Sequence, residues 1–157
     1  MDLGIKGRKA IICASSKGLG KGTAFALAEA GCEVILNGRN AEVLHATAEE
    51  IRKATAVKVI EIVGDVSERA TQDRLLTACP DPDILINNNG GPPFRDFRAL
   101  DRSALVEGVV QNMVTPIELI QRVIDGMVAR QFGRIVNITS ASVLTPVSYT
   151  HLRAHET

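Results

Sequence analysis

A glycine-rich segment near the amino terminus holds the first residues whose spacing could do chemistry. Residues 14–20 read Ala-Ser-Ser-Lys-Gly-Leu-Gly, after an apolar run and before a stretch with helical periodicity. In such a turn, backbone N–H groups and a helix N-terminus can face a pyrophosphate, and Gly18 and Gly20 allow a close approach. Taken alone, the heptapeptide fits equally well a strand-to-helix turn that binds nothing.

Two cations accompany this turn. Lys17 lies within it, and Asn37-Gly38-Arg39-Asn40 follows the next apolar run. That second segment has no carboxylate to accept hydrogen bonds from a ribose 2′-hydroxyl, whereas a guanidinium fork suits a 2′-phosphate. The pair therefore favours NADP (NADPH) as the cofactor and makes NAD less likely than NADP, the alternative being that both side chains are solvated surface charges.

The elements that must position these residues alternate between two patterns. Short apolar runs occupy residues 9–13, 33–37, 57–63, 83–87 and 134–138. Because these runs are nearly continuous, they are typical of strands buried on both faces of a parallel sheet. Helical periodicity fills the gaps, including one long apolar row made of Leu105, Val109, Met113, Ile117, Ile120 and Ile124. The order predicts an α/β fold, a Rossmann-type doubly wound parallel sheet in three α/β/α layers.

Composition narrows the class of protein. The 157 residues are 45% apolar, which suits one domain, and 18 basic residues balance 18 acidic ones along the chain. We therefore expect no nucleic-acid partner. No apolar stretch approaches the roughly 20 residues of a membrane span, so we expect no membrane partner and a cytoplasmic location. The three cysteines, Cys13, Cys32 and Cys79, lack metal-ligand spacing, so we expect reduced thiols and no metal site.

Motifs after successive strands resemble those of the short-chain dehydrogenase/reductase family. Residues 13–20 resemble its T-G-x-x-x-G-x-G turn, with Cys13 and Ala14 in place of Thr and Gly. Asp65-Val66 resembles its adenine-holding Asp-Val pair, and residues 87–90 resemble N-N-A-G with Asn89 replacing Ala. Residues 137–140, Asn-Ile-Thr-Ser, resemble its N-I-S-S element.

This resemblance implies a reaction and a set of site residues. It implies hydride transfer between NADP(H) and a small-molecule carbonyl or alcohol, in the general pattern of 3-oxoacyl-carrier-protein reductases, by a homo-oligomer such as a dimer or tetramer. Ser140 matches the serine that hydrogen-bonds the substrate carbonyl, and Asn112 matches the asparagine that anchors a proton-relay water. The family's tyrosine and lysine are expected downstream of Ser140. The implied cofactor-binding residues are Ala14, Ser16, Lys17, Gly18, Leu19, Gly20, Arg39, Asn40, Asp65, Val66, Asn88 and Gly90.

A proline in the long helix supports the role of Asn112. Pro116 has no N–H, so in a regular helix it leaves the carbonyl of Asn112 without its usual donor and bends the axis. We predict that this carbonyl binds a water facing the active site, the alternative being a proline that is tolerated near a helix bend without such a role. A second apolar row, made of Val106, Val110 and Val114, is interpreted either as core or as a subunit contact.

The last residues have an unusual coding origin. Residues 147–157, VSYTHLRAHET, can be encoded by DNA that resembles a standard transposase sequencing adapter. We therefore expect a truncated dinucleotide-binding domain over residues 1–146, followed by a non-native tail over 147–157. Tyr149 and Arg153 are rejected as the family's tyrosine and lysine, because arginine holds its proton too firmly. We expect this chain to be inactive and its sheet to be incomplete on the carboxyl-terminal side.

Two other functions stay open at this point. The departures at Ala14 and Asn89 also suit a catalytically inactive NADP(H)-binding sensor or scaffold of the same fold. Sugar-nucleotide epimerases or dehydratases use the scaffold too, but their first turn is G-x-x-G-x-x-G. The Gly18-x-Gly20 spacing disfavours that third reading.

Overall fold

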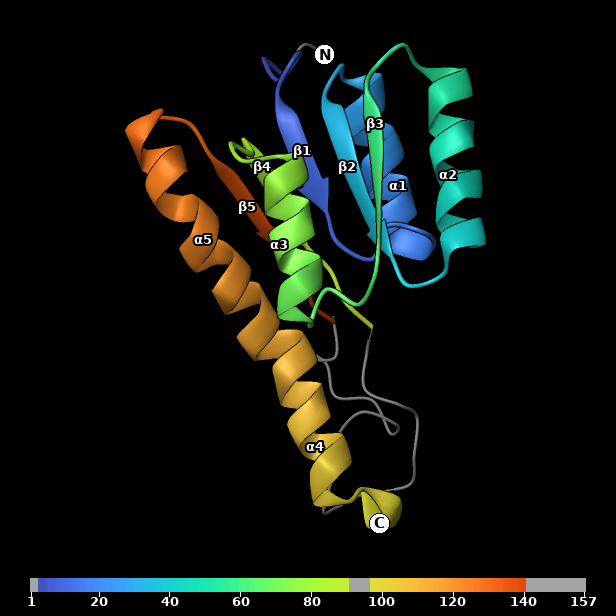
Figure 1. Ribbon diagram of the computed structural model, residues 1–157, viewed down its shortest axis with the longest axis vertical. Helices are drawn as coiled ribbons and strands as arrows, with labels where there is room; N and C mark the ends of the chain where they lie inside the picture. Colours follow the sequence, from blue (N-terminus) through green and yellow to red (C-terminus); the bar gives the residue numbers. More distant parts are fainter. Residues whose placement is uncertain (1–2, 91–96, 141–157) are drawn as a thin grey trace, which may run out of the picture.

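The computed structural model describes residues 3–90 and 97–140 of the chain (Figure 1). The expected tail over 147–157, with Tyr149 and Arg153, lies outside the described residues. Where the chain is described, no helix is long and apolar enough to cross a membrane. The same residues contain no group of three or more His, Cys, Asp or Glu side chains arranged to hold a metal ion.

Five parallel strands form one sheet in the order β3-β2-β1-β4-β5. The strands are β1 (Lys9–Ile12), β2 (Glu33–Gly38), β3 (Val59–Val63), β4 (Ile84–Asn87) and β5 (Arg134–Asn137). The chain runs outward from β1 to β3, then returns to place β4 on the other side of β1. This reversal confirms the doubly wound prediction, and such sheets bind ligands at the carboxyl ends of the strands beside the reversal.

Helices cover both faces of the sheet and complete three layers (Figure 1). On one face, α1 (Gly18–Glu29) and α2 (Ala41–Ala54) bury Ala24, Leu44 and Ile51 against β1 and β2. On the other face, α3 (Arg69–Ala78) and α5 (Thr115–Ala129) bury Leu75, Leu119 and Val123. The central strands are buried on both faces, which explains their continuous apolar runs.

The long helical segment is not uniform. After the 3₁₀ turn η1 (Phe97–Ala99), α4 (Arg102–Val109) is capped by Asp101, whose carboxylate accepts a hydrogen bond from the Ala104 N–H at 2.8 Å. A π-helical turn, η2 (Val110–Val114), then joins α4 to α5. The irregularity expected from Pro116 therefore takes the form of a wide turn with one extra residue.

Most of the apolar row of this segment does not pack on the sheet, although Ile120 packs against the core there. Leu105, Val109, Met113 and Ile117 are each between 46 and 59% exposed. The sheet is instead contacted by Leu119, Val123 and Met127 of α5. The extra residue of η2 rotates the helix faces of α4 relative to those of α5. An apolar row traced through the whole segment is therefore interrupted at η2. Within residues 3–90 and 97–140, β5 is the last strand on this side of the sheet, and its Val136 is 46% exposed.

Candidate functional site

The turns that leave the first four strands converge on one cavity of about 390 Å³. Since all strands are parallel, their carboxyl ends meet at one edge of the sheet. Many of the predicted cofactor-binding residues line this nucleotide cavity: Ala14, Ser16, Lys17, Arg39, Asn40, Asp65, Val66, Asn88 and Gly90. The other three, Gly18, Leu19 and Gly20, form the first turn of α1 directly after Lys17.

Asn37, at the end of β2, connects three of these turns. Its side chain is almost fully buried, with 1% relative exposure of the residue. Its Oδ1 accepts the Ala14 N–H at 3.3 Å, and its Nδ2 donates to the carbonyls of Ile62 (3.1 Å) and Gly64 (3.0 Å). Its backbone also pairs with Ser15 in both directions. Sequence reasoning missed this role, although a buried asparagine closing an apolar strand was a usable signal.

Ala14 has an unusual backbone conformation for a residue with a side chain. Its φ of 46° lies in the left-handed region, where the resembling motif has glycine. Hydrogen bonds hold it there, from its N–H to Asn37 and from the Asn88 Nδ2 to its carbonyl at 3.2 Å. A Cβ on Gly20 would strike that same carbonyl, so only glycine allows α1 to start this close to the turn.

The start of α1 is suited to an anion. Lys17 is the N-cap residue and makes no side-chain capping bond, and the first turn contains no acidic residue. The first turn of α1 therefore supplies no carboxylate to the positive end of the helix dipole or to its first N–H groups. From α2, the buried Thr47 steadies the turn by donating its hydroxyl to the Ser16 carbonyl at 3.0 Å.

Arg39 and Asp65 face one another across the nucleotide cavity. The Arg39 Nη1 lies 3.8 Å from the Asp65 Oδ2, with the arginine side chain 73% exposed and the aspartate 26% exposed. Asp65 is also fixed by Ser67, whose N–H and hydroxyl both donate to Oδ1. An ion pair this long and exposed contributes little stability, so the guanidinium can turn toward an incoming phosphate at small cost.

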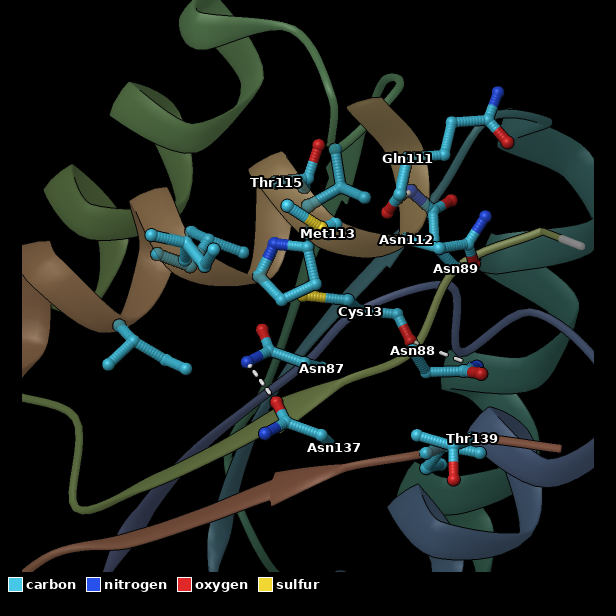
Figure 2. A pocket seen from close by; sticks show the side chains of 16 residues that line it. Cys13, Asn87, Asn88, Asn89, Gln111, Asn112, Met113, Thr115, Asn137 and Thr139 are labelled. Carbon is cyan, nitrogen blue, oxygen red and sulfur yellow. Dashed lines mark hydrogen bonds between the residues drawn. The ribbon is translucent and has the colours of Figure 1, made fainter. Parts of the chain in front are cut away.

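A second cavity of about 290 Å³ adjoins the first (Figure 2). It lies between the η2–α5 segment and the ends of β4 and β5, and Asn112 and Thr139 line it. The Asn112 Nδ2 donates to the Gly108 carbonyl at 3.0 Å. Ser140, the other predicted catalytic residue, is exposed and directly follows Thr139. Val66, Asn88 and Asn89 line both cavities, so one continuous site runs along the sheet edge.

Buried polar atoms give the second cavity a polar base. Asn87 donates through Nδ2 to the Asn137 Oδ1 at 2.8 Å (Figure 2). In the described part of the chain, the Asn87 Oδ1 and the Thr115 Oγ1 are buried without a hydrogen-bond partner. Such atoms cost folding free energy unless a bound molecule satisfies them, so this cavity can accept a polar group. Burial raises the pKa of the neighbouring Cys13 to about 12, which keeps it a neutral thiol.

The carbonyl released by Pro116 depends on the helix register. In an α-helix, residue 116 would donate to Asn112, but in the π register it would donate to Gln111. The Gln111 carbonyl accepts a hydrogen bond from the Asn89 Nδ2 at 3.1 Å. The expectation of a free Asn112 carbonyl assumed a regular α-helix, and in the π turn the affected carbonyl is that of Gln111. A water on the Asn112 carbonyl stays a prediction.

Comparisons with known proteins agree with this geometry. The profile of the short chain dehydrogenase family matches residues 8–151. The dehydrogenase subunit BbsD of Thauera aromatica, which acts on (2S)-[(R)-hydroxy(phenyl)methyl]succinyl-CoA, is 34% identical over 146 residues, covering 90% of this chain and 58% of that protein. The L-sorbose reductase of Gluconobacter frateurii, solved with NADPH and L-sorbose, has a TM-score of 0.88 at 27% identity, covering 95% of this chain and 58% of that one.

A third comparison adds a second nucleotide complex. The 3-oxoacyl-(acyl-carrier-protein) reductase of Agrobacterium tumefaciens C58, solved with NADP bound, has a TM-score of 0.82 at 32% identity. The match covers 92% of this chain and 57% of that one. The chain therefore spans a little over half the length of the relatives that it matches.

Proposed function

Because this chain belongs to the short chain dehydrogenase family, we propose that it is the nucleotide-binding part of an NADP(H)-dependent oxidoreductase. The reaction would transfer a hydride between the cofactor and a small carbonyl or alcohol substrate. The observation that carries this proposal is the nucleotide cavity, which combines an uncapped helix N-terminus with Lys17 and Arg39.

Each part of the nucleotide has a counterpart on the chain. The pyrophosphate would lie on the turn 14–20, where the space beside Gly18 is open, Gly20 lets α1 start close to the turn, and the N-terminus of α1 is positive. Arg39 and Lys17 would hold the 2′-phosphate, and Asp65 and Val66 would border the adenine. When bound, the nicotinamide would accept or supply the hydride. The NADPH and NADP complexes of the two similar reductases support this choice of cofactor.

The second cavity would hold the reacting end of the substrate. We assign Ser140 a hydrogen bond to the substrate oxygen and Asn112 the anchoring of a water, in line with the family pattern. Neither side chain is an acid that exchanges protons near neutral pH. The proton donor therefore belongs to the further length that the relatives have, as a tyrosine beside a lysine. For this reason the 157-residue chain is expected to bind nucleotide without turnover.

The exposed apolar row suggests an assembly. Leu105, Val109, Met113 and Ile117, which lie on α4, η2 and α5, are all exposed apolar side chains. Surfaces of this kind on a helix are commonly buried in subunit contacts. We propose that the whole protein is a homo-oligomer that uses this row. We place it in the cytoplasm, where thiols such as Cys13 and Cys79 stay reduced.

Nucleotide titration tests the proposal. The 157-residue chain is titrated with NADPH and with NADH, and the rise of nicotinamide fluorescence is followed. Saturable binding with at least about tenfold tighter NADPH is expected, because one phosphate meets two cations. Equal affinities would contradict the role of Lys17 and Arg39. Tight NADPH binding combined with no carbonyl reduction by the full-length protein would favour the inactive sensor or scaffold.

A further inference from the structure

One carbonyl in the π turn lacks a donor within its own helix. The Thr115 N–H donates to the Val110 carbonyl, five residues back. It is therefore engaged elsewhere and cannot serve Gln111 as in an α-helix. The next possible donor, five residues after Gln111, is Pro116, which has no N–H. The backbone of the segment thus leaves the Gln111 carbonyl for a partner from outside the helix.

Asn89 supplies that partner from the loop after β4. Its Nδ2 donates to the Gln111 carbonyl at 3.1 Å, and its Oδ1 accepts the N–H of Gly90 at 2.8 Å. Figure 2 shows Asn89 beside Gln111 and Asn112 at the rim of the second cavity. Because both ends of the amide are bonded, its orientation is fixed. The alanine that the resembling motif has at this position could make neither bond.

The two bonds of Asn89 reach into different parts of the site. Gly90, whose N–H donates to the Asn89 Oδ1, lines the nucleotide cavity, while Asn89 itself lines both cavities. Gln111, whose carbonyl accepts the hydrogen bond from the Asn89 Nδ2, directly precedes Asn112 in η2. A movement of the loop when nucleotide binds would therefore be passed through one side chain to the turn that carries Asn112.

We infer that Asn89 is a positioning residue that couples occupation of the nucleotide cavity to the placement of Asn112. The inference rests on the proposed function, since it needs a nucleotide in the first cavity. Asn89 reacts with nothing, and its effect runs through the Gln111 carbonyl. Because the Gln111 carbonyl has no donor within the helix, the bond from Asn89 can set the position of the π turn.

Amide NMR spectra of the 157-residue chain during an NADPH titration test this coupling. In the unaltered chain, the amide resonances of Gln111, Asn112 and Met113 should shift along the same saturation curve as residues lining the nucleotide cavity. In Asn89→Ala, NADPH should still bind within about threefold of the unaltered affinity, while those three shifts fall by more than about half. Unchanged shifts in Asn89→Ala would overturn the inference.

Two further variants separate the tether from general damage. Gln111→Ala removes the bond from the Gln111 Nε2 to Glu107 but keeps the backbone carbonyl, so it should retain the full response. Asn89→Asp keeps an acceptor for Gly90 and loses the donor to Gln111, so at saturating NADPH it should lose the response like Asn89→Ala. It is the variant to measure if Asn89→Ala does not fold. Absence of saturable NADPH binding by the unaltered chain would refute the proposed function, whereas binding without a response at Gln111–Met113 would refute only the coupling.

Discussion

The side-chain oxygen of Asn37 accepts the backbone N–H of Ala14 at 3.3 Å, and thereby braces a residue in the left-handed conformation at the start of the turn 14–20. The two residues are 23 positions apart: Asn37 belongs to β2, and Ala14 lies in the turn after the neighbouring parallel strand β1. The shape of the turn is therefore imposed by a buried amide on β2 as well as by the glycines within the turn.

Replacing Asn37 should destabilise the chain strongly. Asn37→Ala leaves the Ala14 N–H and the carbonyls of Ile62 and Gly64 without their partner, and a loss of about 2–4 kcal/mol in unfolding free energy is expected. Urea denaturation measures the change. The exposed capping residue Asn40, which accepts the Val43 N–H, provides the control, because Asn40→Ala should cost only about 1 kcal/mol. Equal effects of the two substitutions would contradict the bracing role.

Glycine at position 14 should stabilise the chain. A residue with a Cβ pays about 1–2 kcal/mol in the left-handed region, partly offset by the greater freedom of an unfolded glycine, so Ala14→Gly should gain about 0.5–1 kcal/mol. The matched control is Ala26→Gly on the exposed side of α1, which should lose about 1 kcal/mol. Thermal unfolding compares the two. A loss of stability in Ala14→Gly would show that the conformation is not strained.

Removing Arg39 should bring the affinities of the chain for NADPH and NADH close to one another. Arg39→Ala takes away the guanidinium at the rim of the nucleotide cavity, so NADPH affinity should fall about 10- to 100-fold while NADH affinity stays within about twofold. Competition titrations give both constants. Arg130→Ala is the control. Arg130 directly follows α5 and forms an ion pair with Asp81, so its replacement should leave both affinities unchanged. A parallel loss of NADH binding in Arg39→Ala would speak against recognition of the 2′-phosphate.

Alkaline pH should destabilise the chain through its buried thiols. Burial raises the pKa of Cys13 from 9.0 to about 12 and that of Cys79 from 9.0 to about 11. The folded state therefore favours the protonated thiol, and this stabilisation is complete below about pH 9 and is lost as the pH rises toward 12. Urea unfolding should show that the free energy of unfolding falls between pH 8 and pH 10.5. In Cys13→Ala this free energy should fall less steeply with pH. An identical slope in that variant would exclude Cys13 as the cause.

Asn89 and Pro116 should be energetically coupled. Pro116→Ala restores an N–H that can serve the helix backbone near Gln111, so the Asn89 tether becomes less necessary. In the Pro116→Ala background, Asn89→Ala should therefore cost about 1 kcal/mol less than in the unaltered chain. A double-mutant cycle by chemical denaturation gives this interaction energy. Strict additivity would mean that the Asn89 bond does not replace a missing backbone donor.

The sequence determined the fold and the location of the nucleotide cavity. Continuous apolar runs alternating with helical periodicity leave few arrangements other than a parallel sheet with crossover helices, because parallel strands need such connections. Once the sheet is parallel, the residues after each strand must meet at one edge, which is why Lys17, Arg39 and Asp65 line one cavity. None of this required knowledge of a side-chain contact.

The tertiary structure alone decided the contacts that hold the site. The bracing of Ala14 by Asn37 depends on which amide of several is buried between β1 and β3, and sequence does not rank them. Pro116 is compatible with an α-helical or a π-helical register of the turn before it, so its presence in the sequence does not decide between them. In the structure a π turn precedes Pro116, Leu119 and Val123 pack on the sheet, and the Gln111 carbonyl accepts a hydrogen bond from Asn89. Local pattern fixes which segments become helix or strand, whereas hydrogen-bond register is settled by neighbours distant in the chain.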